Sequence, residues 1–146
     1  MTNAIIMNTL TGAVSEYDGF GFHSITPTHA GSALGLYALG GDSDMGLPIV
    51  AVVTTGKTLV GGAQKKAIDS VHFGLKGSGT STLTVTGESA SYSYPFPVLP
   101  AGVSRAKPGR GIRENYLAFS YSNTDGADFQ LDLIEIPVEA SKNRKV

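Results

Sequence analysis

Cysteine and tryptophan are both absent from the 146 residues of this chain. Without cysteine the chain forms no disulfide, and it offers neither a thiolate ligand for a metal nor a cysteine nucleophile. Without tryptophan it lacks the side chain with the largest face for stacking on a sugar. Charge is nearly balanced, with a formal net charge of -1. This balance points to neither a nucleic-acid partner nor a membrane partner.

Long apolar runs are missing as well. No stretch approaches the ~18 apolar residues that a membrane-spanning helix needs. Residues 1–7 contain no basic segment followed by a long apolar one, so they are not a signal peptide. We therefore expect a protein that is made in the cytoplasm and does not enter a membrane.

Turn-forming residues are plentiful, with 19 glycines and 7 prolines spread along the chain. Between them, apolar and polar residues alternate with the period of two that is typical of half-buried strands. The apolar members of the clearest runs are Val71, Phe73 and Leu75; Leu83 and Val85; Leu117, Phe119 and Tyr121; and Phe129, Leu131 and Leu133. This pattern predicts an all-β fold, namely an antiparallel β-sandwich.

Four local patterns refine this prediction. The apolar phase changes near Leu133 and Ile134, which predicts a β-bulge. The continuous apolar run 49–53 predicts a strand buried on both faces. The Asn-Thr-Asp-Gly turn at 123–126 predicts a hairpin between strands at 116–122 and 129–138. Three prolines within residues 94–100 predict an edge strand or an extended crossover.

The chain is expected to have three parts. Residues 1–46 are predicted to form short strands, as an N-terminal β-hairpin arm or a small subdomain. Residues 47–140 are predicted to form the sandwich, and residues 141–146 a flexible basic tail. The three parts together are expected to form one compact domain.

No motif for catalysis, a cofactor or a metal is complete. The Gly56-Lys57-Thr58 sequence lacks the preceding glycine of a phosphate-binding loop. The segment around Asp42 and Asp44 lacks the further oxygen ligands and the flanking helices of a calcium loop. No serine lies in a nucleophile-elbow pattern. We predict a protein that is not an enzyme and that has no catalytic residues, no cofactor and no metal.

Charge is uneven near the C-terminal half. A basic segment carries Arg105, Lys107, Arg110 and Arg113, and an acidic stretch follows it with Asp125, Asp128, Asp132, Glu135 and Glu139. The basic segment is either a solvated loop or a surface that pairs with the carboxylates of a neighbouring subunit. A nucleic-acid surface is disfavoured because aromatic residues are not interleaved with the cations.

Four segments, in order, resemble a group of tailed-bacteriophage virion structural proteins. They are residues 8–18, residues 35–44, residues 55–58 with Lys65 and Lys66, and residues 108–116 running into 123–132. The similar region often forms the C-terminal part of longer members and ends in a short basic tail. The resemblance implies a component of a virion that is made in the host cytoplasm, and we expect a tail or tail-tip subunit. It carries over no catalytic residues.

The expected partners are therefore other copies of the chain and other virion proteins. The candidate subunit-contact residues are Arg105, Lys107, Arg110, Arg113, Tyr94 and Phe96. One alternative is a capsid-decorating or cement protein. The other is a carbohydrate-binding module for a host-surface glycan, in which Tyr92, Tyr94 and Phe96 stack on sugars.

Overall fold

The computed structural model describes residues 4–17, 21–60, 65–109 and 111–140, and within them every regular element is a β-strand. The prediction of an all-β fold is therefore confirmed. The chain divides into two compact units, Met1–Gly41 and Asp42–Val146. The described residues include no helix that is long and apolar enough to cross a membrane. The predicted basic tail, 141–146, lies outside the described residues.

The N-terminal unit consists of short antiparallel strands. A hairpin pairs β1 (Ala4–Met7) with β2 (Val14–Tyr17), and a three-stranded sheet contains β3 (Ser24–Ile25), β4 (His29–Ser32) and β5 (Gly35–Ala38). The turn of the hairpin is held by the Asn8 side chain, whose Oδ1 accepts a hydrogen bond from the Leu10 backbone N–H at 2.9 Å. Short strands are thus present in the part of the chain for which they are predicted.

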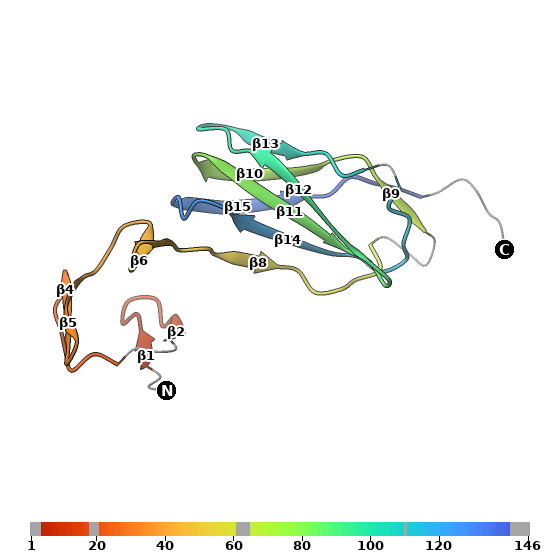
Figure 1. The fold of residues 1–146 in the computed structure, drawn as a ribbon. Coiled ribbons are helices and arrows are strands. Elements are labelled where there is room, and N and C mark those ends of the chain that lie inside the picture. The colour runs from red at the N-terminus through yellow and green to blue at the C-terminus, as the bar shows by residue number, and fades with distance from the viewer. Residues whose placement is uncertain (1–3, 18–20, 61–64, 110, 141–146) are drawn as a thin grey trace. The chain divides into compact units, whose positions relative to one another are not determined.

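The second unit contains the β-sandwich. One sheet has the order β12 (Ser91–Pro97), β11 (Thr80–Thr86), β14 (Ala118–Asn123), β8 (Val52–Thr54). The other has the order β13 (Val103–Ala106), β10 (Val71–Gly77), β15 (Phe129–Glu135). All pairings are antiparallel. Figure 1 shows the two sheets as layers of one sandwich.

Two short strand pairs accompany the sandwich. The pair β6 (Ser43–Asp44) and β7 (Leu47–Pro48) precedes it, and β9 (Lys66–Ile68) pairs with β16 (Val138–Ala140). The β6–β7 turn places Met45 and Gly46 at φ values of 49° and 84°. Positive φ at both central residues is typical of a type I′ turn.

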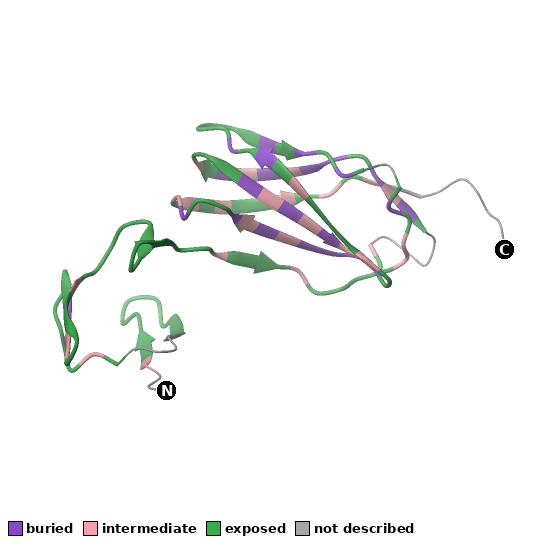
Figure 2. Ribbon diagram, in the orientation of Figure 1, coloured by how far each residue is buried: buried purple, intermediate pink, exposed green. Residues whose placement is uncertain are grey.

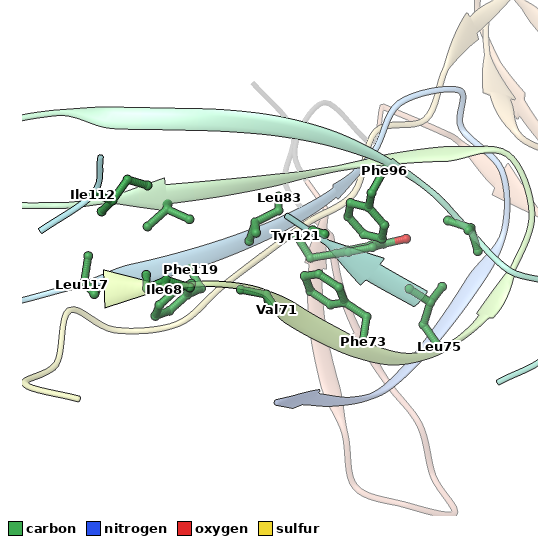
Figure 3. Packing of buried hydrophobic residues seen from close by; sticks show 13 residues of the cluster. Ile68, Val71, Phe73, Leu75, Leu83, Phe96, Ile112, Leu117, Phe119 and Tyr121 are labelled. Atoms are coloured by element: carbon green, nitrogen blue, oxygen red, sulfur yellow. The ribbon is translucent and has the colours of Figure 1, made fainter. Parts of the chain in front are cut away.

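The core lies between the two sheets. Phe73 of β10 stacks on Phe96 of β12 with ring centroids 4.9 Å apart, and Tyr121 of β14 lies 5.6 Å from Phe73. Figure 3 shows these rings converging from both sheets. Burial alternates along β10 and β11, as the period of two predicts. The apolar faces of both sheets thus form one shared core.

Two refinements of the sequence prediction are confirmed. Leu75 pairs with Leu131 and Gly74 pairs with Leu133, so Asp132 is the extra residue of a β-bulge. The bulge moves Leu133 to the outer face of the sheet. The proline-rich strand β12 lies at the edge of its sheet, where prolines remove no essential ladder donor.

Two other predictions are wrong. Residues 116–122 and 129–138 do not form a hairpin, because β14 pairs with β11 and β8 in one sheet while β15 pairs with β10 in the other. Residues 49–53 do not form a strand buried on both faces, because β8 lies at a sheet edge and Val52 is 61% exposed. The opposite sheet has three strands rather than four, so it has one strand fewer with which to cover the four-stranded sheet that ends in β8.

Candidate assembly surfaces

The predicted contact cations lie on the surface of the second unit. Arg105 is in β13, Lys107 follows that strand directly, and Arg113 precedes β14; all three are exposed. Arg110 lies outside the described residues. In β13 the neighbours of Arg105, Ser104 and Ala106, are fully buried, so the alternation of the strand directs Arg105 outward.

The prediction that Phe96 is a contact residue is wrong. Phe96 is 3% exposed and belongs to the core. Tyr92, Tyr94 and Phe96 pair with the buried face of β11, so all three lie on the inner side of β12. Tyr94 is half-buried against the core, and Tyr92 remains 47% exposed. These positions do not form the aromatic platform on which the carbohydrate-binding alternative depends.

A charged row crosses the outer face of the three-stranded sheet. His72 of β10 pairs with Arg105 of β13 on one side and with Glu135 of β15 on the other. Cross-strand partners share a face, so the three side chains lie in one line from edge to edge. The His72 Nε2 atom lies 3.0 Å from the Ser70 Oγ atom. The row therefore begins with a cation at one sheet edge and ends with a carboxylate at the other.

An apolar row lies beside the charged one. Gly74 pairs with Val103 on one side and with Leu133 on the other. Val103 is 55% exposed and Leu133 is 57% exposed. A Cβ atom on Gly74 would lie only 3.2 Å from the Leu133 Cβ, so the glycine makes room for that side chain. Each sheet edge thus presents one charged and one apolar residue at matching positions.

The sequence marks Glu135 only as part of an acidic stretch, and Leu133 only as part of a strand whose apolar phase changes near it. The signal that identifies them as surface residues is the bulge at Asp132, because it reverses the faces of the residues after it. The sequence predicts the bulge near Leu133 and Ile134. A bulge one residue earlier, at Asp132, places the Leu133 side chain on the outer face of the sheet.

The outer face of the other sheet is rich in hydroxyl groups. Thr54, Ser120, Thr84 and Ser93 pair across all four strands. The Thr54 Oγ1 and Ser120 Oγ atoms are 2.9 Å apart, as are the Thr84 Oγ1 and Ser93 Oγ atoms. These hydroxyls satisfy one another in pairs, so this row is a stabilised polar surface.

Many large apolar side chains between residues 4 and 60 are uncovered. The exposed ones are Ile5, Ile6, Met7, Leu10, Val14, Ile25, Leu34, Leu36, Leu39, Met45, Leu47, Ile49, Val50, Val52, Val53 and Leu59. Among the described residues of the N-terminal unit, Ala30 is the one buried hydrophobic residue. Figure 2 shows this part of the chain as largely exposed. Apolar surface of this extent is typical of an interaction region.

Asp42 directly precedes the short strand β6 and Asp44 lies in it, and both residues are exposed. Within the part of the chain that the structure describes, no three histidine, aspartate or glutamate side chains gather as a metal site would require.

Comparisons with known proteins give no match: no family model matches the sequence, no curated protein matches it, and no solved structure matches it.

Proposed function

We propose that this chain is a structural subunit of a tailed-bacteriophage particle, most specifically of its tail, and that it acts through contacts between proteins. The proposal combines two lines of support. Four segments that occur in the same order as in tailed-phage structural proteins suggest that the chain belongs to a phage particle. The uncovered apolar strands of residues 4–54 suggest that the chain functions in contact with other proteins.

The uncovered strands carry the proposal. In β1 the side chains of Ile5, Ile6 and Met7 are 75%, 43% and 60% exposed. Consecutive residues of a strand point to opposite faces, so neither face of β1 is covered. Isolated two-stranded hairpins have marginal stability in water. Covering these side chains stabilises by roughly 25 cal/mol per Å² of apolar surface removed from water. An assembly partner supplies such cover.

The first experiment locates the chain in particles. Heads and tails are separated from phage whose genome encodes the chain, and each fraction is analysed by quantitative mass spectrometry. The proposal expects a few to a few dozen copies in the tail fraction. Copies in the hundreds on heads would make the chain a decorating protein, and absence from both fractions would refute the structural role.

A truncation tests whether the hairpin is a contact element. Removing residues 1–19 deletes β1 and β2, whereas every residue of the hydrophobic core lies in the unit Asp42–Val146. The truncated chain is expected to unfold at the same denaturant concentration as the full chain and to be lost from particles. Thr11→Ser, a small change in the exposed turn of the same hairpin, serves as the control and is expected to be incorporated normally.

A further inference from the structure

We propose that copies of this chain join head to tail through the two edges of the three-stranded sheet, β13 of one copy against β15 of the next. The inference deepens the proposed structural role by naming the partner, a second copy, and the edges that it uses. It is carried by the complementary rows on those edges.

Both edges are open. The sheet order is β13, β10, β15, and within the described residues neither outer strand has a second backbone partner. Open strand edges present unpaired N–H and C=O groups that another chain can pair with. β10 is antiparallel to both β13 and β15, so β13 and β15 run in the same direction. A repeated rotation and translation of the subunit therefore brings them together as a parallel pair, with evenly spaced hydrogen bonds.

The charges on the two edges are complementary. Arg105 and Glu135 occupy the same row of one sheet, because both pair with His72. When the sheet continues into the next copy without a change of register, Glu135 of one copy lies beside Arg105 of its neighbour. An arginine guanidinium binds a carboxylate with two parallel hydrogen bonds, so this pair favours one register.

The apolar row agrees with the charged one. In the same register, Leu133 of one copy lies beside Val103 of the next, since both pair with Gly74. Each side chain is more than half exposed in the isolated chain. Contact between them removes apolar surface from water on both copies. Two independent rows thus specify the same pairing.

Symmetric pairing of like edges has the opposite electrostatics. Two β15 edges place Asp132 and Glu135 of both copies at one interface, and two β13 edges bring two copies of Arg105 together. Like charges across a strand pair are destabilising. The edges therefore favour a head-to-tail contact, which generates a ring when the rotation closes and a filament when it does not.

Engineered cysteines test the contact directly, because the natural chain has no cysteine. The variant with both Val103→Cys and Leu133→Cys is oxidised at high concentration and examined by denaturing electrophoresis without reductant. Within one copy these positions are two strand spacings apart, roughly 10 Å, which is beyond the reach of a disulfide. A ladder of linked multimers is expected from the double variant, and only monomers from either single variant.

Charge reversal tests the register. In the double-cysteine background, Glu135→Lys or Arg105→Glu alone is expected to reduce the yield of linked multimers at least tenfold at low salt. The two reversals together restore opposite charges across the interface and are expected to restore the ladder. Glu88→Lys makes the same charge change at an exposed turn beside the other sheet and is the matched control.

Each outcome separates this inference from the proposed function. Monomers alone from the double-cysteine variant, or dimers from a single-cysteine variant, would overturn head-to-tail pairing; the edge charges would then act as guards against sheet extension. If the variant is incorporated into particles but oxidation of those particles gives no 103-to-133 link, the structural role stands and the edge contact is wrong. A ladder from a chain that is absent from particles supports the contact and refutes the phage role.

Discussion

The hydroxyl oxygens of Ser81 and Tyr121 lie 2.8 Å apart in the centre of the sandwich, and each residue is only 1% exposed. Ser81 belongs to β11 and Tyr121 to β14, and the tyrosine ring also packs 4.7 Å from the ring of Phe129 in the opposite sheet. A polar pair in an apolar core is tolerated because each hydroxyl satisfies the other. The pair thus joins two strands at the layer where both sheets meet.

Removing one hydroxyl of this pair is expected to cost more than removing both. Tyr121→Phe leaves the Ser81 hydroxyl buried without its partner, so the free energy of unfolding is expected to fall by about 1–3 kcal/mol. The Tyr121→Phe and Ser81→Ala double variant leaves no orphaned hydroxyl and is expected to be more stable than the sum of the single effects predicts. Urea denaturation of the parent chain, Tyr121→Phe, Ser81→Ala and the double variant measures the coupling energy of the pair. Strictly additive effects would contradict a hydrogen bond between the two hydroxyls.

Phe96 and Tyr92 differ in role although they lie on the same face of β12. Phe96→Ala removes a ring that stacks on Phe73 and is expected to lower the free energy of unfolding by about 3–5 kcal/mol. Tyr92→Ala removes a half-exposed ring, so a loss below about 1 kcal/mol is expected at this control position. Thermal unfolding followed by circular dichroism measures both. Equal losses would mean that Phe96 is not the core residue that the packing indicates.

The sequence predicts strands well because burial on one face of a sheet imposes a period of two. The alternation at Phe119 and Tyr121 and at Phe129 and Leu131 is correct in the structure, and so is the bulge that follows. Which strands pair is a different matter. Two strands that face one core alternate in the same way whether they share a sheet or lie in opposite sheets. The hairpin prediction failed for this reason.

The positions of the candidate contact residues are likewise only partly predictable from the period of two. Alternation places Tyr92, Tyr94 and Phe96 on one side of a strand, but it does not tell how far the opposite sheet extends over them. Pairing of Arg105 with His72, and of His72 with Glu135, joins residues from three separate strands. Such a row depends on strand order, which a period of two does not encode.

Asn123 holds the segment before β8 against the end of β14. Its Oδ1 accepts a hydrogen bond from the Ala51 N–H at 2.7 Å, and its Nδ2 donates to the Ile49 and Ala127 carbonyls at 3.3 and 3.1 Å. Asn123→Ala is expected to lower the free energy of unfolding by about 1–3 kcal/mol, because partly buried backbone groups lose their partners. Amide hydrogen exchange at Ala51 is expected to accelerate.

The neighbouring position provides the control for this effect. The exposed Thr124 hydroxyl donates to the Thr80 carbonyl at 2.6 Å, and water can replace it. Thr124→Ala is therefore expected to leave exchange at Ala51 unchanged. Equal protection of the Ala51 amide in Asn123→Ala and in the parent chain would show that the asparagine does not fix this segment.

Gly126 is expected to be the glycine least tolerant of substitution in the connection between the two sheets. Its φ of 74° lies in the left-handed region, which costs other residues roughly 1–2 kcal/mol. A Cβ atom there would also collide with the Asp42 carbonyl oxygen and lie 3.0 Å from the Ile49 nitrogen. Asp42 accepts the hydrogen bond of the Ile49 N–H at 2.9 Å, so the collision falls on a paired backbone.

Gly126→Ala is therefore expected to lower the free energy of unfolding by about 2–4 kcal/mol, the sum of backbone strain and displacement of the paired segment. Gly56→Ala is the matched control, because a Cβ atom at Gly56 meets nothing within 4 Å and its φ is not positive. Urea denaturation of both variants measures the difference. If Gly126→Ala is as stable as Gly56→Ala, segment 42–49 does not lie close to the turn at 123–126 in the folded chain. That turn would then be free to join β14 and β15 in the hairpin that its sequence favours.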